Sequence, residues 1–187
     1  MLSQYDPSDS TYSINKCLLL LPDIKFVTGI ITLLEFQCVI GRMWREKKLE
    51  LNEEMLKELN KLPEHHQIKA ISRYCFKKFN VKIVSIQGIA KLNFNDEMYE
   101  IDKNFFTAYK ISPKLTQRTL DSLQIATAIN IKLYSNYNIE YFLTNDTNIL
   151  KSSANIRTLT QIIPVSSEDM ASLLKLKDFT SEDKINQ

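Results

Sequence analysis

Hydrophobic residues along the chain follow two spacings, one typical of strands and one typical of helices. Strands are predicted where apolar, mostly β-branched or aromatic, residues cluster, at residues 24–28, 81–86, 140–144 and 162–165. Helices are predicted where apolar positions recur at helical spacing or turn residues open a helix, at residues 11–21, 30–47, 52–61, 63–79, 103–111, 121–133 and 170–176. Strands that alternate with helices predict an α/β domain with a mainly parallel sheet.

Several segments carry more specific expectations. The first half of the helix at residues 30–47 is apolar nearly all round, which predicts burial. Ser112-Pro113 is expected to end the helix that begins at Lys103, and Pro164 to confine the last strand to a sheet edge. The signal is weak at residues 87–100, which form either a hairpin or an irregular insertion. A short helix and a polar tail at residues 167–187 are expected to follow the main domain, residues 1–166.

The composition is that of an ordinary globular domain, and it excludes only a few kinds of site. The chain has 187 residues, a formal charge of +2 and ordinary globular fractions of hydrophobic and charged residues. The three cysteines, Cys17, Cys38 and Cys75, form no CxxC pair, which argues against a zinc knuckle or a disulfide framework and favours a reducing cytoplasm. Three glycines leave no glycine-rich phosphate loop, and no apolar run is long enough to span a membrane.

Glu35 is the first residue with candidate chemistry. It is the only acid between Ile24 and Arg45, and its neighbours on the helix surface are largely apolar. A carboxylate in such surroundings costs several kcal/mol unless it is paired or binds a metal ion. Two interpretations remain at this point: a metal ligand, or a structural interaction with Arg42 further along the same face.

Asp121 and Asp146 are the other two candidates. Asp121, followed by Gln124, has the form of a helix-capping pair, and Asp146 follows a predicted strand, where it could cap the next turn. The carboxyl ends of strands in an open α/β sheet are also where ligand-binding groups collect. Each aspartate alone fits a cap at least as well as a metal ligand. Together with Glu35, in the order helix, helix start and strand end, the three acids form a more specific pattern.

This pattern resembles the PIN domain, the metal-dependent nuclease fold found in VapC-type toxins. Residues 28–35 resemble the family's segment around its helix glutamate, and residues 142–146 (FLTND) resemble its FVTND strand end. Residues 120–128 (LDSLQIATA) resemble its LDALHLATA helix, with Ser122 and Gln124 in place of the commoner alanine and histidine. The resemblance implies a three-layer α/β/α domain, in which residues 87–100 are an insertion.

The resemblance also implies a function. Glu35, Asp121 and Asp146 would be catalytic ligands of Mg²⁺ or Mn²⁺, with Thr144 and Asn145 orienting water or a ligand carboxylate, in a cytoplasmic endoribonuclease. RNA is the implied substrate, and an antitoxin protein and a second copy of the chain are implied partners. The basic side chains at the end of the Glu35 helix are either its phosphate contacts or a solvated helix terminus: Arg42, Arg45, Lys47 and Lys48.

One family feature has no counterpart in this sequence. PIN domains usually open with a hydrophobic strand that ends in a metal-binding aspartate, and no hydrophobic strand precedes Asp6. The missing aspartate is expected to fall a few residues before Met1, to have been lost in a decayed paralogue, or to be replaced by another segment. Loss would favour an alternative function, a non-catalytic PIN-like module that binds RNA or a protein.

Overall fold

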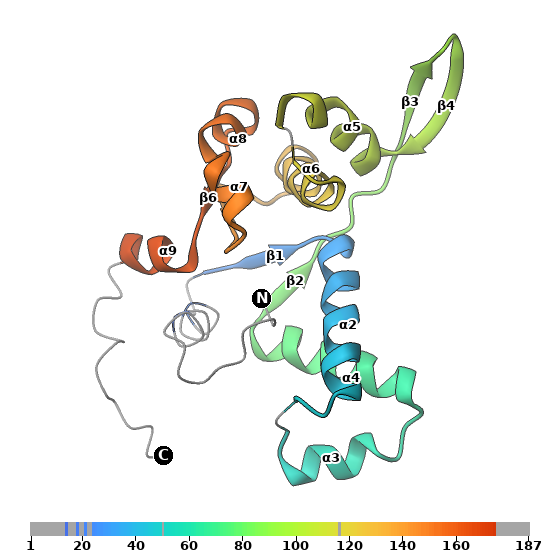
Figure 1. Ribbon diagram of the computed structural model, residues 1–187, viewed down its shortest axis with the longest axis vertical. Coiled ribbons are helices and arrows are strands. Elements are labelled where there is room, and N and C mark those ends of the chain that lie inside the picture. Colours follow the sequence, from blue (N-terminus) through green and yellow to red (C-terminus); the bar gives the residue numbers. More distant parts are fainter. Residues whose placement is uncertain are drawn as a thin grey trace.

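The computed structural model describes residues 14, 18, 21, 24–49, 51–115 and 117–174. The helix predicted at residues 11–21 falls almost wholly outside these residues, and so do Asp6, Cys17 and the polar tail at residues 177–187. The described chain mixes helices with short strands, as Figure 1 shows.

The described strands form three separate two-stranded sheets. β1 (Phe26–Thr28) pairs in parallel with β2 (Val81–Ile83), and β5 (Tyr141–Leu143) pairs in parallel with β6 (Ile163–Val165). β3 (Ile89–Phe94) and β4 (Glu97–Asp102) pair antiparallel. The mixture of helices with parallel strand pairs confirms the α/β class, but no pairing between described strands joins these pairs into one sheet.

Helices make up most of the described chain. In chain order they are α2 (Ile30–Arg45), α3 (Glu53–Leu59), α4 (Glu64–Lys78), α5 (Lys103–Leu115), α6 (Thr119–Tyr134), α7 (Thr147–Lys151), α8 (Ser153–Thr160) and α9 (Ser167–Leu173). Capping explains several starts. Asn52 accepts a bond from the Met55 amide before α3, and Ser166 accepts one from Asp169 before α9.

Two apolar clusters hold the helices together. Ile40, Leu59 and Ile71 join α2, α3 and α4. A second cluster, whose buried residues are Leu115, Ile125, Ile149 and Ile156, joins α5 and α6 to α7 and α8. Full burial of one side chain of this size contributes about 1.5–3 kcal/mol, so the second cluster fixes α6 beside the short helices that follow β5.

The predicted burial of the first half of α2 is wrong. Ile30 and Leu34 are 44% and 53% exposed, whereas the buried residues of this helix are Ile40, Gly41 and Met43. The physical reason is that the second half of α2 packs against α4, through Ile40 and Ile71. Apolar composition alone does not say which half of a helix finds a partner.

Pro113 does not end α5, contrary to the prediction. The helix continues to Leu115 with the proline inside it. Proline removes one backbone donor, and the cost is limited because the helix runs only two residues further. The pattern also missed α7 and α8, whose short lengths give little periodicity.

The weak segment at residues 87–100 belongs to a regular hairpin. Asn95 and Asp96 lie between β3 and β4 with φ of 51° and 63°, the pair of positive values that a two-residue type I′ turn requires. Asn and Asp tolerate this conformation better than most residues. The hairpin stands out from the rest of the molecule (Figure 1).

A helix that crosses a bilayer must be long and almost wholly apolar. Within the described ranges, none is long and apolar enough to cross a membrane.

Candidate functional site

The first half of α6 brings Glu35 and Asp121 into one neighbourhood. The Gln124 amide Nε2 donates a hydrogen bond to the Glu35 carboxylate Oε2, although the residues lie 89 positions apart. Gln124 follows Asp121 by three positions on α6, so the two side chains share one face of the helix. Glu35 therefore faces the same turn of α6 that carries Asp121.

A close backbone approach places α2 against α6. A Cβ atom built on Gly29, at the start of α2, would lie 2.2 Å from Thr127 Cγ2. That distance is far below van der Waals contact, so only glycine fits without movement of the neighbouring chain. The absence of a side chain at Gly29 therefore lets the start of α2 approach Thr127 of α6 closely.

Asp146 stands at the carboxyl end of the β5 strand. Its Oδ1 accepts hydrogen bonds from the backbone amides of Asn148 at 2.7 Å and Ile149 at 3.4 Å, which makes it the N-cap of α7. Its own amide donates to Thr144 Oγ1 at 3.1 Å. The expected capping role is confirmed, and Thr144 helps to fix the aspartate in place.

Asp121 is not the N-cap of its helix, which corrects the capping interpretation. Arg118 occupies that position, and Asp121 lies in the first turn of α6. Its carboxylate accepts a backbone hydrogen bond from Arg118, so it still satisfies a free helix-end donor. Because tertiary packing starts the helix two residues earlier than the apolar pattern predicted, the aspartate is displaced from the cap.

The environment of Asp121 opposes its negative charge. Oδ2 of Asp121 is buried and has no hydrogen-bond partner among the residues that the structure describes. Burial, and then the negative charge of Asp146, raise the pKa of Asp121, while the Arg118 charge and backbone bond lower it by less. Two neighbouring carboxylates, one with an unsatisfied oxygen, are the arrangement that a bound cation would relieve.

Asn145 has a structural role in this arrangement. Its Oδ1 accepts hydrogen bonds from the Ser167 amide at 3.0 Å and the Ser167 hydroxyl at 3.1 Å. These bonds join the end of β5 to the start of α9, so the side-chain oxygen of Asn145 is occupied. Its predicted part in orienting water or a ligand carboxylate stays a prediction.

The basic residues of α2 and of the chain that follows it do not pair with Glu35 in the described part of the chain. Arg42 is absent from the ion pairs formed between described residues, so the proposed partnership with Glu35 is not formed. Arg45 lies 3.7 Å from Glu64, and Lys48 lies 2.7 Å from Glu46. Arg45 is also about 15 Å along the helix axis from Glu35, so the basic cluster at residues 42–48 lies away from the acids.

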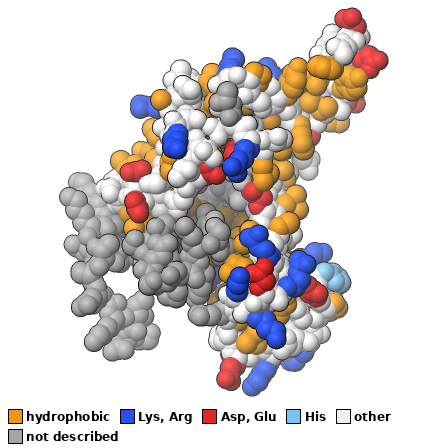
Figure 2. All heavy atoms as spheres, in the orientation of Figure 1, with side chains coloured by type: hydrophobic (Ala, Val, Ile, Leu, Met, Phe, Trp, Pro, Cys, Tyr) orange, Lys and Arg blue, Asp and Glu red, His pale blue; other side chains and the backbone are white. Residues whose placement is uncertain are grey.

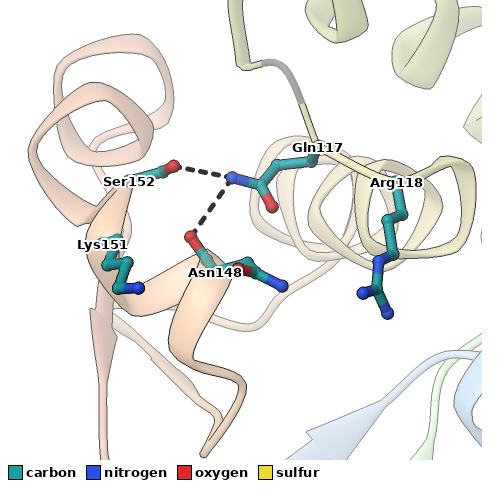
Figure 3. A pocket seen from close by; sticks show the side chains of 5 residues that line it. All are labelled: Gln117, Arg118, Asn148, Lys151 and Ser152. Carbon is teal, nitrogen blue, oxygen red and sulfur yellow. Dashed lines mark hydrogen bonds between the residues drawn. The ribbon is translucent and has the colours of Figure 1, made fainter.

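A pocket near the aspartates supplies positive charge that the sequence patterns did not single out. It has a volume of about 340 Å³, and α7 and the chain before α6 line it with Gln117, Arg118, Asn148, Lys151 and Ser152. Gln117 Nε2 donates to the Asn148 carbonyl at 3.3 Å and to Ser152 Oγ at 2.6 Å, and so bridges the two sides (Figure 3). Arg118 and Lys151 are adjacent in sequence to no other cation, which is why no charge run marked them.

The donor chemistry of the site fits a hard divalent cation. Glu35, Asp121 and Asp146 offer only carboxylate oxygens, the ligands that Mg²⁺ and Mn²⁺ prefer, and Oδ2 of Asp121 has no hydrogen-bond partner in the described ranges. In the part of the chain that the structure describes, no group of three or more His, Cys, Asp or Glu side chains is already arranged to hold a metal ion. Glu35 is instead bound to Gln124.

Comparisons of the chain with protein-family models, with curated proteins and with solved structures returned no match.

Proposed function

We propose that the protein is a metal-dependent endoribonuclease of the PIN type. The observation that carries the proposal is the buried Oδ2 of Asp121, which lies beside Asp146 and has no hydrogen-bond partner within the described part of the chain. An uncompensated carboxylate oxygen costs free energy that a structural role would not require. Gln124 of the same helix bonds Glu35, which supports Glu35 as the third acid of the proposed site.

Glu35, Asp121 and Asp146 are the residues that would hold Mg²⁺ or Mn²⁺. A cation bound there would activate water and stabilise the charge that develops on the scissile phosphate during in-line displacement. The protein's own contribution is to hold the carboxylates in place. The α7 amides and the Thr144 hydroxyl fix Asp146, and the Arg118 backbone fixes Asp121.

The substrate class follows from the charge around the site. Carboxylates alone repel a polyanion, so phosphate contacts must come from neighbouring cations. Arg118 and Lys151 line the pocket beside the aspartates, and guanidinium and ammonium groups are the usual partners of backbone phosphates. In this proposal they hold the RNA next to the acids, while the basic cluster at residues 42–48 makes at most outlying contacts.

The fold expected of the family is part of the same proposal. Glu35 follows β1 and Asp146 follows β5, and both lie beside the first half of α6. In this proposal the carboxyl ends of the two parallel pairs face one rim, and the pairs are parts of one sheet in a three-layer α/β/α domain. A toxin paired with an antitoxin protein is the narrower form of the proposed function.

The test is RNA cleavage by the full chain with Mg²⁺ or Mn²⁺. Asp146→Asn should abolish cleavage while the protein stays folded, because asparagine is as good an N-cap as aspartate. Asp96→Asn, in the hairpin turn, is the matched control and should cleave normally. Absence of metal-dependent cleavage in the wild type, or full activity in Asp146→Asn, would refute the proposal.

RNA binding provides the second part of the test. Arg118→Gln and Lys151→Gln should each weaken binding and reduce the slope of log affinity against log salt by about 1. Arg45→Gln, about 15 Å along the helix axis from Glu35, is the matched control with a smaller effect. Binding with the predicted slopes but without any cleavage would identify a non-catalytic RNA-binding module instead.

A further inference from the structure

Helix α4 has a basic face that the proposed nuclease site does not use. One side of the helix packs against α2 through Ile68 and Ile71. At about 100° per residue, the opposite side carries side chains that are all basic and exposed: His66, Lys69, Arg73 and Lys77. These residues, named here the α4 stripe, extend over about 16 Å of the helix axis.

The charge of the α4 stripe is not neutralised by the rest of the described chain. The sequence has no aspartate or glutamate between Glu64 and Asp96. The ion pairs and cation–π contacts between described residues involve none of the lysine and arginine side chains of the stripe. The His66 ring lies 4.1 Å from the neighbouring His65 ring, between centroids. Lys and Arg side chains gather with histidine on this part of the molecule in Figure 2, so the surface favours an anionic partner.

A pocket of about 390 Å³ opens along the stripe. Its lining combines basic and apolar side chains: Leu62, His66, Lys69, Ala70 and Arg73. Gln67 fixes one wall, because its Nε2 donates to the Leu62 carbonyl and its Oε1 accepts from Trp44 Nε1, both at 2.8 Å. A guanidinium, an ammonium and an imidazole N–H around one hollow are donors that suit a phosphate group.

The stripe continues beyond the pocket, which favours a polymer over a single anion. Lys77 follows Arg73 by four positions, about 6 Å further along the helix axis, and it does not line the pocket. Cations that recur on successive turns complement anions that recur along a nucleic-acid backbone. A free phosphate would use only the pocket, and the flat surface of an anionic membrane would not enter it.

We propose that the α4 stripe binds the phosphate backbone of a nucleic-acid strand, with one phosphate in the pocket and a neighbouring one beside Lys77. The identification of this strand as the RNA substrate rests on the proposed function. The start of α2 approaches α6 at Gly29, whereas α4 packs on the second half of α2, so the stripe lies toward the end of α2 away from α6 (Figure 1). The substrate is therefore an RNA long enough to contact both regions, rather than a nucleotide.

RNA affinity measured without metal tests the stripe, because the proposed nuclease does not cleave the strand under these conditions. The probe is a labelled single-stranded oligouridylate, followed by fluorescence anisotropy with the full chain in EDTA at several salt concentrations. Lys69→Gln with Arg73→Gln should weaken binding by about tenfold and reduce the slope of log affinity against log salt by about 1 for each cation removed.

Lys91→Gln with Lys114→Gln is the matched control. It removes the same net charge from exposed positions on the hairpin and on α5, and it should bind RNA like the wild type. Circular dichroism checks that both double variants fold. An equal loss of affinity in the two double variants would mean that only the overall charge of the protein matters, and it would overturn the proposal.

Two further results would also overturn it. One is a folded wild type that does not bind the oligouridylate. The other is a stripe variant with wild-type RNA affinity, whether or not it loses binding to phosphatidylserine vesicles, since a loss confined to vesicles would identify a membrane surface as the partner. Binding through the stripe without cleavage in Mg²⁺ or Mn²⁺ would support this proposal and refute the proposed function, so the two can fail separately.

Discussion

The side-chain amide of Gln124 donates a hydrogen bond to the Glu35 carboxylate and so joins α6 to the first half of α2. Glu35 was expected either to bind metal or to pair with Arg42, and the structure gives it a different neighbour. The bond holds the carboxylate toward the turn that carries Asp121. It is the structural link between Glu35 and the helix that carries Asp121.

A double-mutant cycle measures this link. Gln124→Ala should lower the free energy of unfolding by about 1–3 kcal/mol, because a hydrogen bond to a charged group is lost. In a Glu35→Gln background the same substitution should cost less, with a coupling energy above about 0.5 kcal/mol. Urea unfolding of the four proteins checks it, and strictly additive effects would show that the bond contributes nothing to stability.

Asp121 should make stability depend on pH. Burial and the Asp146 charge raise its native pKa, so the folded protein holds this proton more tightly than the unfolded chain, where aspartate titrates near about 3.9. The stabilisation is complete below the unfolded pKa and is lost as pH rises through the raised native value.

Asp121→Asn removes this titration. Above the native pKa of Asp121, the variant should be more stable relative to the wild type than it is below the unfolded pKa. Urea unfolding of both proteins across the acidic and neutral range measures the difference in their free energies of unfolding. Carboxyl groups distant from Asp121 contribute equally to both proteins and drop out of this difference. A constant difference at every pH would mean that the Asp121 pKa is not raised.

Substitution of Gly29 should destabilise the protein, because the Thr127 methyl group occupies the space that a side chain would need. Gly29→Ala places Cβ 2.2 Å from Thr127 Cγ2 and should destabilise the protein by about 1–3 kcal/mol through overpacking. Thr127→Ser removes Cγ2 and keeps the hydroxyl that donates to the Leu123 carbonyl at 2.8 Å.

Thr127→Ser should therefore restore most of the stability that Gly29→Ala removes. A small deficit should remain, because alanine is a poorer N-cap than glycine. Thermal unfolding of the two single variants and the double variant measures the rescue. An equal cost of Gly29→Ala in both backgrounds would exclude the Thr127 methyl group as its cause.

Local chemistry explains which features the sequence predicted. Asn52, followed by acids and an apolar pattern, marked the start of α3, and Asp146 capped the turn after β5 as expected. The apolar runs located all four predicted strands, because β-branched and aromatic residues are enriched in strands. The acids were recognised by their order along the chain.

The remaining features depend on contacts between distant segments. The Gln124–Glu35 bond depends on where α2 and α6 meet, and the exposure of Leu34 depends on which half of α2 packs against α4. Arg118 and Lys151 form one pocket only because α7 lies beside the start of α6. Helical periodicity reports which side chains share a face, but it does not report which face finds a partner.

The central claim is that Glu35, Asp121 and Asp146 form one divalent-cation site, and Mn²⁺ titration by calorimetry tests it most directly. The wild-type chain should bind Mn²⁺, and Asp121→Asn should weaken binding by about 10-fold or more, the size of effect that smaller changes around metal ligands already produce. Asp96→Asn should bind like the wild type. Equal affinity of the wild type and Asp121→Asn, or no Mn²⁺ binding by the folded wild type, would contradict the account.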